Sequence, residues 1–277
     1  MNFLLIQENG RHADNRNFRE CFSLQRSLKE IKQNCDVWGL GHFNYEQKPD
    51  FNNYDVIVNL ENYDESGWVP DLSEVSSKKY LWSIDAHVRG LAPYKKEFRR
   101  GNYTKILQST LQLVDEDSIW FPNAYDDTLI KPLKVDKKHD VGFCGNVNNR
   151  IGLLALLDKT FNLKQDIFVI GNDMVSAINS YKVHFNCNIG IDINYRSFET
   201  IGCGTALVTN YNKAYEKLGF VHKKNCMFYS NPDQLIMCIR ELLDNEELRR
   251  SIELESTVLA KNHTYTKRAE QFLKEIL

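Results

Sequence analysis

The sequence predicts two α/β domains, each built on a parallel sheet with helices on both faces. The length of 277 residues suits two cores better than one. Short runs such as DVIVNL (55–60) are mainly apolar rather than alternating, which is typical of parallel strands that are buried on both sides. The segment PNAYDDTLIKPLKVDKKHD (122–140) is rich in charge, contains two prolines and lacks periodicity. We therefore expect domains at 1–136 and 137–277, with the last helix able to cross back to the first.

The first half predicts strands and helices in alternation. NFLLIQ at the start predicts a strand, and the apolar residues between Phe18 and Leu28 have helical spacing. The stretch 94–114 has a basic first half and an apolar second half, and predicts a helix interrupted or begun near Gly101. The further strands are expected at 36–40, 55–60, 80–85 and 118–123.

The second half repeats this pattern. Helices are predicted over 149–159, in a short segment after 172, and over 195–201. A helical pattern fills most of 233–277, with Pro232 at its entry. The strands are expected at 141–146, 166–172, 183–190, 206–210 and 225–230.

Charge and composition exclude several classes of function. The net charge is −2, so no overall field attracts the chain to nucleic acid or to an anionic membrane. We find neither a signal peptide nor an apolar run of 18 residues, and expect a soluble, cytoplasmic protein without membrane contact. Seven scattered cysteines lack zinc-site spacing and are expected to be reduced thiols packed as small apolar groups.

The segment CNIGIDINYRSFETIGCGTALVTN (187–210) carries the most chemical information. A strand leads into a polar turn containing Asn194 and Tyr195, and a helix follows from Arg196. A helix N-terminus offers N–H groups and partial positive charge to a diphosphate, and Arg196 adds a guanidinium suited to phosphate. Glu199, one turn further on, is placed to accept hydrogen bonds from ribose hydroxyls. Gly204, after the helix, is also a predicted donor-binding residue. The simpler interpretation is that Arg196 and Glu199 form a surface ion pair and that the GCG segment only ends the helix.

RSFETIGCGTALVTN resembles the R-x-F-E-x-x-x-x-G-x-x-x-x-T segment of the CgeB-like glycosyltransferases, relatives of the retaining group-one family. YSNPDQLIMCIRELLDNEELRRSI (229–252) is similar to the following part of that family, so that about 138–273 is covered. The resemblance implies a GT-B fold of two Rossmann-like domains facing a cleft, a UDP-sugar donor, transfer with retention, and no required cofactor or metal. The larger family has a sugar-contacting Glu where this chain has Ile191, which leaves Asp192 and Asn194 as candidates.

A second donor element is predicted at VGFCGNVNNR (141–150). Gly145 lets the backbone approach a phosphate, Asn146 follows it, and Arg150 lies in the first turn of the expected helix. Taken alone, this segment is also compatible with an ordinary connection between a strand and a helix.

The acceptor and catalytic groups of GT-B enzymes lie in loops of the N-terminal domain, here 7–15 and 83–90. Asp85 and His87 are the predicted catalytic residues, because either can orient an acceptor hydroxyl or take its proton. Glu8 and His12 are predicted acceptor contacts; a solvated loop position is the alternative for both histidines. The acidic run 115–117 spells DxD, but it is interpreted as a polar turn, with no metal site.

The basic segment PYKKEFRRGNYTK (93–105) includes Lys95 and Arg99 and is a candidate contact for double-stranded DNA, or else a solvated helix face. The chain is similar in size and composition to glucosyltransferases of T-even-like phages, which glucosylate hydroxymethylcytosine in DNA or a glucose already attached to it. The resemblance then implies a hexosyltransferase using UDP-glucose in the host cytoplasm. A bacterial envelope, spore-coat or protein glycosyltransferase and a non-catalytic nucleotide-binding scaffold remain the alternatives.

Overall fold

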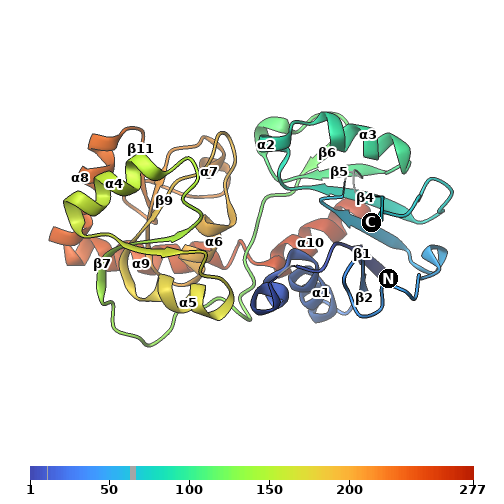
Figure 1. The fold of residues 1–277 in the computed structure, drawn as a ribbon, viewed down its shortest axis with the longest axis horizontal. Helices are drawn as coiled ribbons and strands as arrows, with labels where there is room; N and C mark the ends of the chain where they lie inside the picture. The colour runs from blue at the N-terminus through green and yellow to red at the C-terminus, as the bar shows by residue number, and fades with distance from the viewer. Residues whose placement is uncertain (11, 63–66) are drawn as a thin grey trace. The chain divides into compact units, whose positions relative to one another are not determined.

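The computed structural model describes residues 1–10, 12–62 and 67–277 and contains two parallel sheets (Figure 1). The six-stranded sheet has the order β2-β1-β3-β4-β5-β6, and the five-stranded sheet has the order β11-β10-β9-β7-β8. The predicted fold class of two parallel α/β domains is confirmed. The strands are β1 (Asn2–Ile6), β2 (Asn34–Trp38), β3 (Val56–Leu60), β4 (Lys78–Ser83), β5 (Lys105–Gln108), β6 (Ser118–Trp120), β7 (His139–Gly145), β8 (Lys164–Ile167), β9 (Tyr181–Asn186), β10 (Ala206–Asn210) and β11 (Met227–Tyr229).

Helices lie between many of the successive strands, and three α-helices follow the last described strand. None among the described residues is long and apolar enough to cross a membrane. The α-helices are α1 (Glu20–Glu30), α2 (Ala86–Arg89), α3 (Ala92–Arg100), α4 (Ile151–Phe161), α5 (Gly171–Asn179), α6 (Tyr195–Gly202), α7 (Ala214–Lys217), α8 (Pro232–Asp244), α9 (Glu246–Ala260) and α10 (Tyr265–Ile276), and the 3₁₀ helices are η1 (Ala13–Phe18), η2 (Phe51–Asn53) and η3 (Leu111–Leu113).

The six-stranded sheet is covered on both faces, as its mainly apolar strands predicted. Alternate residues of a strand point to opposite faces. Phe3 of β1 and Tyr80 of β4 therefore contact Phe272 of α10 on one face. On the other face, Leu4 belongs to a buried cluster that includes Tyr94 of α3. Helix α10 lies beside α1 in Figure 1, so the end of the chain completes the first sheet's cover.

The stretch 94–114 holds a helix that is broken at Gly101, as predicted, but its second half forms a strand. Helix α3 ends at Arg100, and KILQ forms strand β5, which pairs with β4 and β6. Ile106 and Leu107 are fully buried between these neighbours. The apolar second half of the stretch is therefore a central strand, because burial in the sheet outweighs a weak helical pattern.

The chain divides into two compact units, each defined by the contacts among its own residues. Unit 1 contains Met1–Asn123, Gly190–Asp192 and Tyr265–Leu277, and unit 2 contains Ala124–Ile189 and Ile193–Thr264. The sequence placed the boundary later, at 136/137. The difference arises because the segment after Asn123 packs on unit 2, where the backbone N–H of Leu133 donates to the side chain of Asn179 at 2.7 Å.

The seven cysteines are all free thiols. Six are buried, and Cys187 is partly exposed. Burial raises the pKa of Cys21 to about 12 and that of Cys144 to about 11. These thiols therefore stay protonated at neutral pH and act as small apolar groups in the cores.

Candidate functional site

Helix α6 begins where the loop after β9 ends. Asn194 is the N-cap residue, and Tyr195 and Arg196 form the start of the helix. Parallel strands bring their carboxyl ends to one edge of the sheet, and the positive end of the helix dipole lies at that edge. The predicted helix at 195–201 and the strand at 206–210 are both found. Asn194 and Tyr195 therefore occupy the position at which a phosphate meets a helix N-terminus.

Arg196 and Glu199 form an ion pair with 2.7 Å between Nη1 and Oε2. Their side chains are only 21% and 16% exposed, so the pair is more enclosed than an ordinary surface pair. Burial acts to lower the pKa of Arg196, but the carboxylate of Glu199 outweighs it and the pKa is raised overall. The ion pair of the simpler interpretation thus exists, and it fixes a charged guanidinium and a carboxylate on one helical face.

His184 supports this helix from the middle of β9. Its Nε2 accepts the backbone N–H of Cys144 at 3.3 Å, which leaves the proton on Nδ1 to be donated to Thr200 Oγ1 at 2.6 Å. Thr200 in turn donates to the carbonyl oxygen of Arg196 at 2.5 Å. Burial, and then the nearby Arg196, lower the pKa of His184 well below 6.5. The ring is therefore neutral, and its tautomer is set by this chain of hydrogen bonds.

Asn188 organises the turn between β9 and α6. Its side-chain Oδ1 accepts the backbone N–H of Asn194 at 3.0 Å, and its Nδ2 donates to Tyr215 Oη at 2.8 Å and to Thr209 Oγ1 at 3.2 Å. Its own backbone N–H donates to Asn210 Oδ1 at 2.7 Å. One buried amide thus connects the start of α6 to the end of β10 and to α7.

Two further side chains complete this buried polar network. Asn186 donates to Ser197 Oγ at 3.1 Å and to Thr209 Oγ1 at 3.2 Å, and its Oδ1 accepts from Asn194 Nδ2 at 3.1 Å. The hydroxyls of Ser197 and Tyr215 are 2.7 Å apart. Buried polar groups that satisfy one another in this way favour a single geometry. The helix start is therefore held rigidly at the edge of the sheet.

Arg150 joins the second predicted donor element to this site. It precedes α4, and it donates from Nε to the carbonyl oxygen of Cys187 at 2.8 Å and from Nη1 to that of Asn146 at 2.8 Å. Burial lowers the pKa of Arg150, and the positive charge of Arg196 adds to the effect. Arg150 is therefore attached to the loop that leads to Arg196 at the start of α6.

The two predicted glycines occupy different places. Gly145 ends β7 with φ of 156° and directly precedes Asn146, which is exposed. Gly204 follows the opposite end of α6 with φ of 66°, and a Cβ there would lie 3.3 Å from Pro132 and Thr257. Asn146, directly after Gly145, thus contacts Arg150 through its carbonyl oxygen, whereas Gly204 follows the end of α6, about 13 Å along its axis from Tyr195.

Asp192, a predicted sugar contact, is grouped with unit 1. Its Oδ1 accepts from Thr110 Oγ1 at 3.3 Å, and its Oδ2 lies 4.0 Å from His87 Nε2. The side chains of His87 and Asp192 are 9% and 6% exposed. Nδ1 of His87 has no hydrogen-bond partner among the described residues. This histidine is therefore enclosed, in contrast to the solvated alternative.

Asp85 precedes α2, directly after the end of β4. Its backbone N–H donates at 2.8 Å to Oε1 of Glu61, which also accepts the N–H of Ile84. Oε2 of Glu61 accepts from the hydroxyl of Tyr94 at 2.7 Å. The loop that carries both predicted catalytic residues is thus attached to the residue that follows β3.

Glu8 and His12 line one small cavity of about 210 Å³ together with Gly10, Asn15 and Arg19. Both predicted residues are exposed, and the structure brings them together after β1. Arg11, also within the predicted 7–15 loop, lies outside the described residues. The cavity combines a carboxylate, an imidazole and a guanidinium, which suits a polar ligand.

The basic segment of α3 is partly neutralised. Lys95 lies 2.6 Å from Asp115 Oδ2 and 2.7 Å from Asp117 Oδ2. Burial acts to lower the pKa of Lys95, but these two carboxylates raise it overall. The acids of the DxD sequence therefore bind a lysine. Arg99 and its neighbour Lys96 are exposed.

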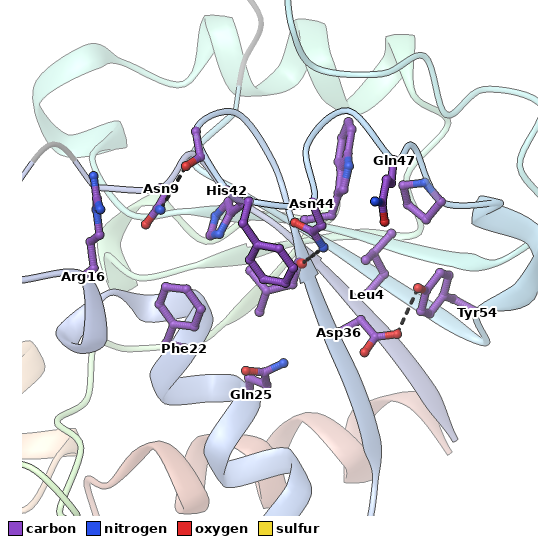
Figure 2. A pocket seen from close by; sticks show the side chains of 15 residues that line it. Leu4, Asn9, Arg16, Phe22, Gln25, Asp36, His42, Asn44, Gln47 and Tyr54 are labelled. Carbon is purple, nitrogen blue, oxygen red and sulfur yellow. Dashed lines mark hydrogen bonds between the residues drawn. The ribbon is translucent and has the colours of Figure 1, made fainter. Parts of the chain in front are cut away.

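Figure 2 shows a larger cavity of about 610 Å³ along β2, the edge strand of the first sheet. Gln25 donates to the carbonyl oxygen of Cys35 at 2.8 Å, and Asn44 donates to that of Val37 at 3.0 Å. Side-chain amides thus cap carbonyl groups of the edge strand, which discourages pairing with another chain. None of the predicted site residues lines this cavity.

Comparison with protein families decides the assignment. A family model described as glycosyl transferase-like matches residues 128–274, more than half of the chain. The chain belongs to the glycosyl transferase-like family. No curated protein matches this glycosyltransferase.

Solved structures share the fold over the whole length. T4 phage BGT in complex with UDP and Mn²⁺ has a TM-score of 0.68 at 15% identity, covering 100% of this chain and 99% of that one. Anabaena Alr3699/HepE in complex with UDP has a TM-score of 0.68 at 9% identity, covering 99% of each chain. Sucrose-phosphate synthase from Thermosynechococcus elongatus has a TM-score of 0.68 at 11% identity, with coverage of 99% and 98%. These TM-scores and coverages establish the GT-B fold of the glycosyltransferase.

Sequence reasoning missed three groups in this glycosyltransferase. Glu61 and Asn188 act through contacts with residues distant in the sequence, so local patterns carried no signal for them. His184 did leave a signal, because a histidine inside the apolar strand VHFN indicates a buried, hydrogen-bonded ring.

Proposed function

We propose that this glycosyltransferase transfers a hexose from a UDP-sugar to an acceptor hydroxyl, and that the hexose is glucose. The observation that carries the proposal is that Arg150 donates to the carbonyl oxygen of Cys187, in the loop between β9 and α6, while Arg196 lies at the start of α6. Two guanidinium groups on this loop and helix start favour a ligand with more than one negative charge, such as a diphosphate. Glu199 supplies a carboxylate on the same helix to accept the ribose hydroxyls.

The chemistry follows from charge development on the leaving diphosphate. As the sugar–phosphate bond breaks, negative charge grows on the phosphate oxygens, and fixed guanidinium groups and a helix N-terminus stabilise it without reorganising. Asp85 is the candidate to orient the acceptor hydroxyl or take its proton. The family resemblance implies retention, in which the leaving phosphate helps to remove that proton.

Duplex DNA containing hydroxymethylcytosine or its glucosylated form is the acceptor that we propose. T4 phage BGT, which aligns along the entire chain, is described as a DNA modifying beta-glucosyltransferase. Exposed Lys96 and Arg99 are available for DNA phosphates. Action in the cytoplasm, that of the host if a phage encodes the chain, is part of this proposal.

One observation favours the alternative acceptor. Lys95 is neutralised by Asp115 and Asp117, and Arg100 pairs with Glu97 at 2.6 Å. The basic segment therefore offers less net charge to DNA than its sequence suggests. An envelope, spore-coat or protein acceptor is the second candidate.

The deciding experiment incubates the protein with UDP-glucose and separate acceptors: unmodified, hydroxymethylated and glucosylated DNA, a peptide pool and saccharides. We expect UDP release together with labelling of hydroxymethylated or glucosylated DNA, and no labelling of the other acceptors. Labelling only of peptide or saccharide would overturn the DNA acceptor. Parallel samples with EDTA or added Mn²⁺ test the expectation that no metal is required.

A non-catalytic nucleotide-binding scaffold is motivated by Ile191, which stands where the larger family has its sugar-contacting Glu. Calorimetry with UDP and UDP-glucose separates this from the enzyme. Binding without transfer to any acceptor would favour the scaffold, and absence of UDP-sugar binding would overturn the enzyme proposal.

A further inference from the structure

The carboxylate of Glu61 receives three hydrogen bonds from two other segments of unit 1. The backbone N–H groups of Ile84 and Asp85 both donate to Oε1, and Tyr94 of α3 donates to Oε2. The backbone N–H of Glu61 donates to the carbonyl oxygen of Trp82 at 2.9 Å. Glu61 therefore connects the end of β3 to the loop 83–90 through both its backbone and its side chain.

The backbone of Glu61 is itself unusual. Its φ is 55°, in the left-handed region that a side chain with a Cβ rarely adopts. Such a conformation costs free energy and persists where surrounding contacts enforce it, often at functional sites. Here the left-handed conformation occurs at the residue whose carboxylate accepts hydrogen bonds from the loop after β4.

Opposing interactions act on the pKa of the Glu61 carboxyl group. Burial, with a smaller contribution from the neighbouring Asp85 carboxylate, outweighs the three donated hydrogen bonds and raises the pKa of Glu61 to about 7. Tyr94 and Asp85 are the titratable side chains that act on it.

We infer that Glu61 is a positioning residue whose side chain holds the 83–90 loop, and with it Asp85, ready for the acceptor hydroxyl. The inference rests on the proposed function for its catalytic consequence. Its structural part, a loop held by a carboxylate, stands on the hydrogen bonds alone.

Two measurements on the full chain test it. Amide hydrogen exchange is followed by NMR at Ile84 and Asp85 in the wild type and in Glu61→Ala, which removes the acceptor oxygens. We expect protection at both amides to fall about ten-fold or more in this variant. The kcat for transfer is expected to fall with it, while KM for the UDP-sugar stays unchanged.

Glu61→Gln keeps a carbonyl oxygen for the two N–H groups, so protection and kcat should stay closer to the wild type than in Glu61→Ala. Tyr94→Phe removes the hydrogen bond to Oε2 and leaves Oε1 in place, so protection should fall less than in Glu61→Ala. Asp71→Asn is the matched control, because Asp71 also accepts a backbone N–H, from Ser73 at 2.9 Å, and it is expected to behave as the wild type.

Wild-type protection at Ile84 and Asp85 in Glu61→Ala would overturn the inference, as would a Glu61→Gln variant that loses as much protection as Glu61→Ala. Exchange requires no substrate. A chain that transfers no sugar but shows the expected exchange would therefore reject the proposed function and support Glu61 as the residue that holds the loop.

Discussion

Arg150 donates a hydrogen bond of 2.8 Å to the carbonyl oxygen of Cys187, and so connects the end of the loop after β7 to the loop after β9. The two donor segments predicted from sequence are joined by this contact. A ligand that reaches Arg150 therefore also acts on the backbone that leads to α6.

Arg150→Ala is expected to weaken UDP binding by about 10- to 100-fold, because a charge-assisted hydrogen bond to phosphate and the link to Cys187 are both lost. Arg150→Lys should restore binding only partly, since an ammonium lacks the rigid planar set of donors that a guanidinium offers to phosphate. Isothermal titration calorimetry measures the change. Arg250→Ala is the control, because that side chain is 73% exposed on α9; equal losses in both variants would contradict the assignment.

Glu199 is expected to recognise ribose. The wild type should bind UDP about ten-fold more tightly than 2′-deoxy-UDP, and Glu199→Gln should reduce this preference, because a neutral amide accepts a hydroxyl hydrogen bond less strongly. Competition calorimetry with both nucleotides gives the ratio. An unchanged ratio would show that the Glu199 carboxylate pairs with Arg196 and does not recognise ribose.

Asp85→Asn is expected to lower kcat by about 10²- to 10⁴-fold if Asp85 takes the acceptor proton, with donor affinity unchanged. Initial rates of UDP release measure kcat. NMR of the anomeric proton in the product gives the stereochemistry. A fully active variant that retains configuration would instead leave the proton to the departing phosphate, and Asp85 would lose its catalytic role.

The sequence was most informative where a pattern is local. Residues 206–210 were predicted as a strand and form β10, and the helix expected from 195 is α6. Strand β5 was missed, because four residues next to a basic helix carry too little periodicity to reveal a central strand. Glu61 could not be anticipated, because its partners Ile84 and Tyr94 are brought to it only by folding.

Tyr215→Phe is expected to destabilise the protein by about 1–3 kcal/mol, because Asn188, Ser197 and Thr209 each lose a buried hydrogen-bond partner. Urea unfolding followed by circular dichroism measures the free energy. The control is Tyr211→Phe, whose hydroxyl lies at an exposed position; it should change stability little. Equal effects would mean that the network contributes no more than a surface contact.

The free energy of unfolding should depend on Glu61 between about pH 4.5 and 7. Burial, opposed by its hydrogen bonds, raises the pKa of this carboxyl in the folded state from its ordinary value of 4.5 to about 7. The folded state therefore binds the proton more tightly, and stability decreases as pH rises through this window, by about 3 kcal/mol. Glu61→Gln should remove that decrease in urea titrations at several pH values; a slope shared with the wild type would contradict the shift.

The distribution of thiols gives the molecule a built-in reporter. Six cysteines are buried and unreactive at neutral pH, whereas Cys187 is partly exposed and its carbonyl oxygen is held by Arg150. A maleimide dye added to the native protein should therefore attach at Cys187 first. Its fluorescence would follow occupation of the loop before α6 in real time, without an engineered cysteine.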